Sequence, residues 1–225
     1  MICNYTTYTI YANIRKCVKY LLSSNIGEVL VILLAELIAA LAIPGLNLHV
    51  PLAGIHLLWI NLVTDSLPAF GLGMEKPEDS VMDEKPRPKD ENFFAQKLGL
   101  HIGLEGVVVG LLTLASYVIG FKAYGHEVAS TMAFITLAFT QLFHSYNVKS
   151  DLSVFTKQAF NNKFLNLAFI AGAVMQLAVV YIPGVNIVFE SVALALPQLA
   201  IAIGCAFGIV IVMEAYKFIT KLIKK

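Results

Sequence analysis

Six apolar stretches, each long enough to cross a lipid bilayer, make up most of this chain, and short charged or Pro/Gly-containing segments separate them. They are 20–43, 54–73, 97–121, 128–148, 164–182 and 192–216. An α-helix needs about 20 mainly apolar residues to span the hydrocarbon core, because each residue advances it by about 1.5 Å. In lipid, a helix satisfies its own backbone hydrogen bonds. The sequence therefore predicts an all-α fold: a polytopic membrane helical bundle of six transmembrane helices.

The composition excludes a soluble globular domain of this length. Hydrophobic residues make up 58% of the chain, charged residues only 14%, and the mean hydropathy is +0.74. This leaves too little polar surface to face water, so the lipid bilayer is the expected partner. The formal net charge is +1 and no basic face is present, so no nucleic-acid partner is expected. Neither a zinc site nor a disulfide framework is expected from the scattered Cys3, Cys17 and Cys205.

The basic residues predict how the chain is threaded through the membrane. All but one of the 16 lysines and arginines lie before the first stretch, between the second and third, between the fourth and fifth, or after the sixth. The exception is Lys122. Cytoplasmic loops carry an excess of Lys and Arg, so both termini are expected in the cytoplasm, with the helices paired as three hairpins. We expect an integral, multi-pass protein of a prokaryotic plasma membrane.

The same pattern divides the chain into five parts. They are a cytoplasmic stalk (1–19), a first transmembrane hairpin with polar motifs (20–73), a cytoplasmic loop (74–96), a four-helix membrane region (97–219) and a basic cytoplasmic tail (220–225). The loop is rich in proline and charge, so it is predicted to be an extended connector rather than a domain.

Polar residues gather on one face of the first predicted helix. Asn25, Glu28 and Glu36 fall within an arc of about 80°, because each residue turns a helix by about 100°. One charged side chain near the bilayer centre costs about 2.5–3.5 kcal/mol on insertion scales. Two carboxylates on one stripe therefore predict a face that meets protein or water. The alternative is a carboxylate that only reaches the interface, which suits Glu28 better than Glu36.

The second predicted helix combines an amide, a hydroxyl and a carboxylate with a helix breaker. Asn61, Thr64 and Asp65 share a face about 100° wide, and Pro68 follows. Proline lacks a backbone donor and clashes with the carbonyl four residues earlier, so the helix is expected to unwind near Thr64. Freed carbonyls beside these side chains would suit calcium, which takes about six to eight oxygen ligands. A simple proline kink with a hydrogen-bonded aspartate is the alternative.

These two segments resemble the ion-binding helices of a family of pumps. SSNIGE (23–28) and LLWINLVTDSLPAFGLG (57–73) are similar to the fifth and sixth transmembrane helices of type II P-type ATPases, in particular the calcium pumps of the sarcoplasmic-reticulum kind. The loop EKP…VMDEKPRP resembles the family's sixth-to-seventh connector, and residues 130–147 resemble its eighth helix. The resemblance covers nearly the whole chain. It implies the ion-translocating membrane part of a calcium-transporting ATPase.

The resemblance also implies a set of cation ligands. They are Asn25, Glu28, Asn61, Thr64, Asp65 and Gln141. Asp65 would bridge both cation sites where the family has two. Gln141 stands where the two-site calcium pumps have a glutamate, which implies one calcium ion per cycle. Glu36 departs from the family, where an uncharged residue is expected, and is either a counter-transported proton site or the partner of a polar neighbour.

Other parts of such a pump do not occur in these 225 residues. They are the phosphorylated DKTGT, the TGES loop, the nucleotide-binding domain, the TGDGVND hinge and the fourth-helix PEGL. The chain alone is therefore not expected to hydrolyse ATP, and ATP and Mg²⁺ belong to the complete pump. The expected partner is a missing N-terminal pump portion, encoded upstream in a truncated or frame-disrupted gene, or a separate subunit. The alternatives are a passive cation carrier or channel, and a membrane binding module that associates with an intact pump.

Features of the third and fourth predicted helices have simpler explanations. Two G-x-x-x-G spacings, 99–103 and 106–110, predict close packing of the third helix within the bundle, with homodimerisation as the alternative. Glu105 on the same helix is expected to be a buried hydrogen-bonding group. His144 on the fourth is expected to be structural.

Overall fold

A computed structural model describes residues 2–41, 49–76, 98–150 and 152–223 of the chain. These residues form α1 (Ile2–Ala40), α2 (Gly54–Trp59), the π-helical η1 (Ile60–Thr64), α3 (Ser66–Gly73), α4 (Leu98–Tyr124), α5 (His126–Lys149), the 3-10 helix η3 (Lys157–Phe160), α6 (Lys163–Tyr181), α7 (Val185–Val188) and α8 (Leu196–Ile223). No strand occurs in these four ranges, which confirms the all-α prediction. Most of the predicted loop 74–96 and the last two residues of the predicted tail lie outside the described residues.

Six helical segments in the described part of the chain are long and apolar enough to cross a membrane. They are α1, the joined α2–η1–α3, α4, α5, α6 and α8. The number agrees with the prediction from the apolar stretches. The predicted stalk and the first stretch form one continuous helix, because no Pro or Gly turn interrupts residues 2–26. The last helix begins at Leu196 rather than 192 and extends beyond 216 to Ile223.

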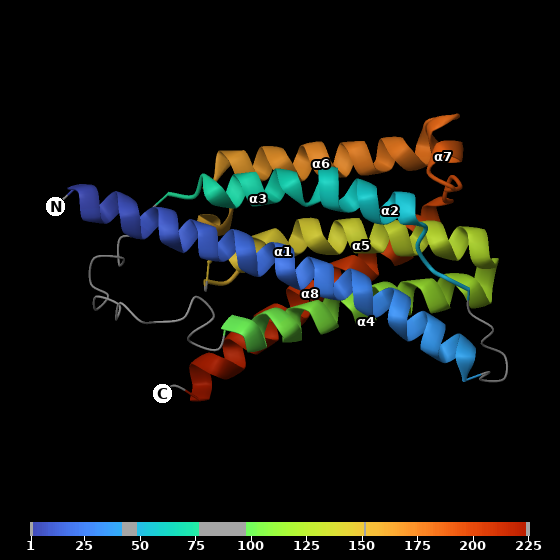
Figure 1. Cartoon of the computed structure of the whole chain (residues 1–225), viewed down its shortest axis with the longest axis horizontal. Helices are drawn as coiled ribbons and strands as arrows, with labels where there is room; N and C mark the ends of the chain where they lie inside the picture. Colours follow the sequence, from blue (N-terminus) through green and yellow to red (C-terminus); the bar gives the residue numbers. More distant parts are fainter. Residues whose placement is uncertain (1, 42–48, 77–97, 151, 224–225) are drawn as a thin grey trace.

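The helices run side by side in alternating directions (Figure 1). The start of α1 and the end of α8 lie at the same end of the bundle, whereas the turn between α4 and α5 and the short α7 lie at the opposite end. This arrangement is that of an even number of spanning helices. The prediction that both termini lie in the cytoplasm stays a prediction.

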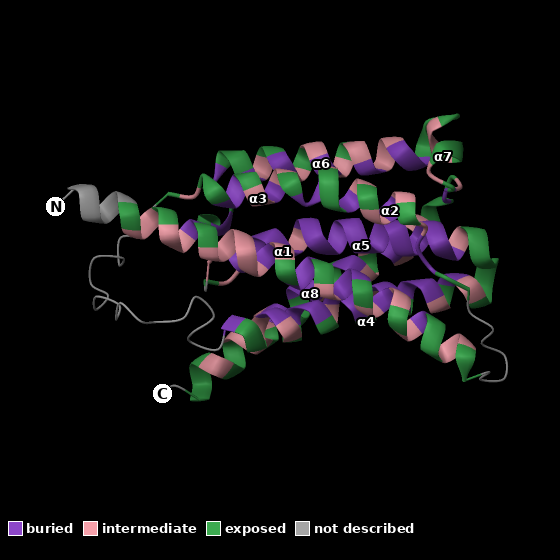
Figure 2. Ribbon diagram, in the orientation of Figure 1, coloured by how far each residue is buried: buried purple, intermediate pink, exposed green. Residues whose placement is uncertain are grey.

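Helix α5 is the centre of the bundle. It packs against α1, α4, α6 and α8. In its most apolar 18-residue segment 89% of the residues are buried, compared with 28% in the corresponding segment of α8. Figure 2 shows α5 almost entirely buried while the outer helices alternate between buried and exposed residues. The outer faces are apolar too, because lipid is as apolar as the interior. The polar residues of α5 from Ser130 to Asn147 are therefore enclosed by protein.

Helices α1 and α4 approach closely through glycines. A Cβ added to Gly106 would lie 2.5 Å from Ile26 Cγ2 and 2.9 Å from the Ser23 carbonyl oxygen, and one added to Gly110 would lie 3.2 Å from the Gly27 carbonyl oxygen. A Cβ on Gly103 would meet nothing within 4 Å. Only the second predicted G-x-x-x-G spacing therefore mediates packing between these two helices. Their close contact lets side chains of α4 reach those of α1.

The second spanning segment widens where the sequence predicted that it would unwind. The backbone N–H of Asp65 donates to the Ile60 carbonyl five residues earlier at 2.8 Å, which is the π-helical pattern. Pro68 lies inside α3, and its missing N–H leaves the Thr64 carbonyl without its usual helical donor. The backbone before Pro68 therefore stays helical: the π-helical turn of η1 takes the place of the unwound stretch that was predicted. Asp65 lies at the junction between the wide turn and α3.

Candidate functional site

Two of the predicted ligand residues, Asn61 and Gln141, donate hydrogen bonds to the carboxylate of a third, Glu28. Glu28 on α1 is buried, with 5% of its surface exposed. Its Oε2 accepts a hydrogen bond from Asn61 Nδ2 of η1 at 2.7 Å, and its Oε1 accepts one from Gln141 Nε2 of α5 at 3.1 Å. The Asn61 amide also donates to the Leu57 carbonyl at 3.0 Å. Three spanning segments therefore meet at this carboxylate.

A second buried carboxylate belongs to the same predicted set. Asp65 is 1% exposed, and its neighbour Thr64 is buried to the same degree. Asp65 Oδ1 accepts a hydrogen bond from the hydroxyl of Tyr20 on α1 at 3.2 Å. Tyr20 was not among the predicted site residues. The available signal was its position two helical turns before Glu28, which places it near the same face of α1.

Several buried oxygen atoms have no hydrogen-bond partner among the described residues. Among them are Ser24 Oγ, Asp65 Oδ2, Thr140 Oγ1 and Gln141 Oε1. An unpartnered buried acceptor costs about 1–3 kcal/mol. Two of these atoms belong to predicted ligand residues, and a third, Ser24 Oγ, lies one turn before Glu28 on α1. Carboxylate, amide and hydroxyl oxygens are the ligands of hard cations, so the residues present fit calcium.

The described residues contain no group of three or more His, Cys, Asp or Glu side chains that could hold a metal ion. Two carboxylates, Glu28 and Asp65, are available in the cluster, so amide, hydroxyl and backbone oxygens would have to complete a coordination shell. This favours a cation that accepts neutral oxygen ligands over one that prefers imidazole or thiolate.

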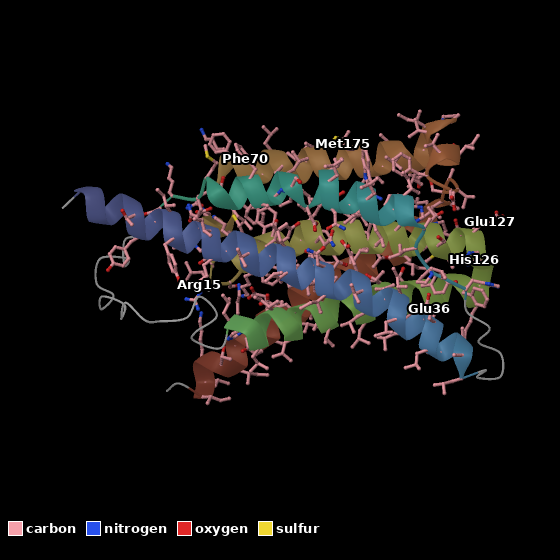
Figure 3. All side chains as sticks on the ribbon, viewed as in Figure 1. Arg15, Glu36, Phe70, His126, Glu127 and Met175 are labelled. Carbon is pink, nitrogen blue, oxygen red and sulfur yellow. The ribbon has the colours of Figure 1, made fainter. Side chains whose placement is uncertain are left out.

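The remaining predicted residues lie at the edge of the cluster or away from it. Asn61 is exposed although its amide nitrogen contacts Glu28, and Asn25, one turn before Glu28, is also exposed. The cluster is therefore buried on its α5 side and open on the other. Glu36 is exposed and lies about 12 Å further along α1, in the half remote from the N-terminus (Figure 3). The structure does not bring Glu36 to the two buried carboxylates.

An ion pair joins a partly exposed lysine on α1 to a buried glutamate on α4. Lys19 Nζ is 2.7 Å from Glu105 Oε1, and His144 Nε2 of α5 is 3.4 Å from Glu105 Oε2. The prediction that Glu105 is buried is confirmed, since its side chain is only 2% exposed. Its contacts with Lys19 and His144 fit the prediction that it is a buried hydrogen-bonding group rather than a ligand, but its partner lysine was not predicted.

The geometry defines a membrane protein of six spanning helices with two carboxylates and several amide and hydroxyl oxygens buried between them. Residues 49–219 match the family described as "Cation transporting ATPase, C-terminus". The chain belongs to this family of P-type cation pumps, of which it represents the C-terminal membrane region.

Curated relatives agree with this assignment. A calcium-transporting ATPase of Bacillus subtilis (strain 168) is 40% identical over 197 residues, which cover 87% of this chain and 21% of that protein. Calcium-transporting ATPase 1 of Bacillus cereus (strain ATCC 10987 / NRS 248) is 38% identical over 205 residues, covering 83% of this chain and 22% of the relative. A third, calcium-transporting ATPase lmo0841 of Listeria monocytogenes, is 34% identical over 216 residues, covering 94% and 23%. The chain thus spans less than a quarter of the length of these three relatives.

Proposed function

We propose that the chain is the ion-translocating membrane part of a calcium-transporting pump of the sarcoplasmic-reticulum-like subgroup. The observation that carries this proposal is the meeting of Asn61 and Gln141 at the Glu28 carboxylate. Three spanning segments supply oxygen-bearing side chains there, and Asp65 adds a second buried carboxylate with one unpartnered oxygen. The names of the relatives support calcium as the ion.

The proposed ligands are Asn25, Glu28, Asn61, Thr64, Asp65 and Gln141. In the structure the amide nitrogens of Asn61 and Gln141 face Glu28 and act as its hydrogen-bond donors. An amide nitrogen cannot ligate a cation, because its lone pair is delocalised into the carbonyl. The amides would therefore rotate on binding so that their oxygens face the ion, and the cation would replace the two N–H groups as the electrostatic partner of Glu28.

The charge of the cluster favours one calcium ion per cycle. Glu28 and Asp65 together carry two negative charges when both are ionised, which balances one divalent ion. Gln141 contributes a neutral oxygen, so a second calcium ion at the same place would lack a compensating charge.

ATP and Mg²⁺ enter this proposal only through a complete pump. The N-terminal pump portion would supply phosphorylation, nucleotide binding and a fourth-helix segment that completes the open side of the cluster near Asn25 and Asn61. The complete protein would lie in the plasma membrane of a prokaryote, with both ends of this chain in the cytoplasm. That orientation rests on the basic residues of the connecting segments.

The test is calcium-dependent phosphorylation in a reconstituted complex. The chain is co-expressed with the part of the Bacillus subtilis relative that lies outside the matched segment, and phosphorylation from ATP is measured against calcium concentration. Asp65→Asn removes a buried charge while keeping the shape of the side chain, and it should abolish calcium-dependent phosphorylation. Glu127→Gln, at the opposite end of the bundle from Arg15, is the matched control (Figure 3). Normal calcium activation of the Asp65→Asn complex would refute the assignment of Asp65.

A further inference from the structure

A chain of contacts links the ion pair on α1 and α4 to the candidate cation site. Glu105 is held from two sides, by Lys19 Nζ at 2.7 Å and by His144 Nε2 at 3.4 Å. The His144 ring stacks on the Tyr20 ring, with centroids 6.3 Å apart and planes 27° from parallel. The Tyr20 hydroxyl in turn donates to Asp65 Oδ1 at 3.2 Å.

The hydrogen bonds around His144 determine which of its nitrogens carries a proton. The Ser23 hydroxyl donates its single proton to the Tyr20 carbonyl at 2.9 Å. Its oxygen also lies 3.2 Å from His144 Nε2. A carboxylate can only accept, so Nε2 is assigned a hydrogen that faces Glu105 Oε2 at 3.4 Å. Ser23 and Glu105 together therefore fix the orientation of the imidazole ring against Tyr20.

Burial makes this arrangement rigid. Tyr20, Ser23 and His144 are each fully buried, and the Glu105 side chain is 2% exposed. Gly106, the neighbour of Glu105, allows α4 to approach the Ser23 carbonyl. The Tyr20 ring thus has little freedom to turn while His144 is held, and its hydroxyl is kept in reach of Asp65.

We infer that Glu105 is a positioning residue for the cation site: through His144 it holds the Tyr20 ring so that its hydroxyl orients Asp65, with Oδ1 occupied and Oδ2 available to a cation. Lys19 balances the charge that this role places in the membrane. The inference rests on the proposed function, because it assigns Asp65 to a cation site. Glu105 itself ligates nothing.

The first test is a double-mutant cycle on the full chain reconstituted with the N-terminal part of the Bacillus subtilis relative. Calcium binding is followed as the calcium concentration that gives half-maximal phosphorylation from ATP. Outer-shell partners of metal ligands typically change affinity by about 10–100-fold, so Glu105→Gln should weaken calcium binding by about tenfold or more. In a Tyr20→Phe background the same substitution should change affinity by less than about twofold, because the route to Asp65 is already cut.

Two controls separate positioning from general damage. Lys19→Gln combined with Glu105→Gln removes the uncompensated lysine charge, so the thermal unfolding temperature should recover while calcium affinity stays low. Glu127→Gln removes a carboxylate at the opposite end of the bundle from Arg15, so it should change neither the thermal unfolding temperature nor the calcium affinity. Additive effects of Glu105→Gln and Tyr20→Phe on affinity would overturn the inference, as would recovery of affinity together with stability in the paired variant.

The second test needs no calcium and is independent of the proposed function. The infrared carboxylate band of Asp65, taken as the difference between the unmodified chain and Asp65→Asn, reports its hydrogen bond to Tyr20. Glu105→Gln should shift this band as far as Tyr20→Phe does. An unshifted band would overturn the positioning role. A shifted band, together with a reconstituted complex that shows no calcium-dependent phosphorylation, would leave the positioning role standing and count against the cation site.

Discussion

Replacing Gln141 by glutamate tests whether charge sets the affinity of the proposed cation site. In the structure Gln141 Nε2 donates to Glu28 Oε1 at 3.1 Å, and Gln141 is fully buried. Gln141→Glu exchanges this donor for a second carboxylate at the same place. Two unit charges about 4 Å apart interact by about 4 kcal/mol at an effective dielectric constant of about 20. Without a cation, this repulsion destabilises the cluster.

A divalent cation between the two carboxylates reverses the sign of that interaction. Part of the repulsion is relieved by proton uptake before calcium binds, so only a fraction of the roughly 4 kcal/mol contributes to the binding free energy. A contribution of about 1.4 kcal/mol corresponds to a change of about tenfold in calcium affinity. We expect Gln141→Glu to bind calcium at least about tenfold more tightly at pH 8, or to bind an additional ion. The gain should shrink towards pH 6, because a proton shared by the two carboxylates competes with calcium.

The assay is isothermal titration calorimetry with calcium at both pH values, on the chain and on the reconstituted complex. Gln176→Glu is the matched control, since Gln176 is a fully buried glutamine whose Oε1 accepts from Trp59 Nε1 rather than facing a carboxylate. The unmodified complex should bind one calcium ion with a Hill coefficient of about one. Cooperative binding of two ions by the unmodified complex, or unchanged affinity in Gln141→Glu, would refute the reasoning.

Three further predictions concern packing, the wide helical turn and the isolated chain. Gly106→Ala should lower the free energy of unfolding by about 1–3 kcal/mol, because the added Cβ would lie 2.5 Å from Ile26 Cγ2. Gly103→Ala, whose Cβ would meet nothing within 4 Å, should leave stability unchanged. Equal melting temperatures of the two variants in detergent would contradict the packing of α1 against α4. Pro68→Ala supplies a backbone N–H to the Thr64 carbonyl, so it should raise the melting temperature. The same hydrogen bond occupies an oxygen that could ligate calcium, so calcium binding should weaken several-fold. Unchanged binding in a calorimetric titration would show that this carbonyl is no ligand. The purified chain should show no ATPase activity in a coupled assay and should bind calcium no tighter than millimolar by calorimetry, whereas micromolar binding or turnover would indicate a self-sufficient protein.

The helical bundle could be predicted because in a membrane the length of an apolar run determines the element. Helix ends were less accessible. Residues 192–195 belong to an apolar run but are not helical, since the Val192 N–H donates to Thr131 Oγ1 of α5, a partner 61 residues away. Pro68 predicted a disruption, but not that the backbone would widen rather than open. That choice depends on packing around the segment, which no local pattern contains.

The site was predictable where residue types repeat a motif, and not where it depends on contacts between distant helices. Glu28, Asn61 and Gln141 were singled out and do meet, whereas Tyr20 was missed because its partner Asp65 is 45 residues away. Lys19 was assigned to a cytoplasmic stalk by its position beside other basic residues. Its pairing with Glu105 requires the glycine contact between α1 and α4, and the spacing of those glycines predicts an approach but not which helix is approached.

The uneven burial of the proposed ligands connects the architecture to the weak binding expected of the isolated chain. Gln141 is enclosed because α5 is surrounded by other helices, and this holds one side of the Glu28 carboxylate in place. On the other side, the exposed Asn25 and Asn61 belong to α1 and the second spanning segment, which the described residues do not cover there. A cation at Glu28 and Asp65 would complete its coordination shell with water on that side. Water molecules are not held in place as protein ligands are, so they add less to the binding free energy than a fixed charge or dipole would. The amides of Asn61 and Gln141 would also lose their present hydrogen bonds to Glu28 without a rigid position to move to. A further helix against the open side would remove both costs, so tight binding is expected only when such a partner is present.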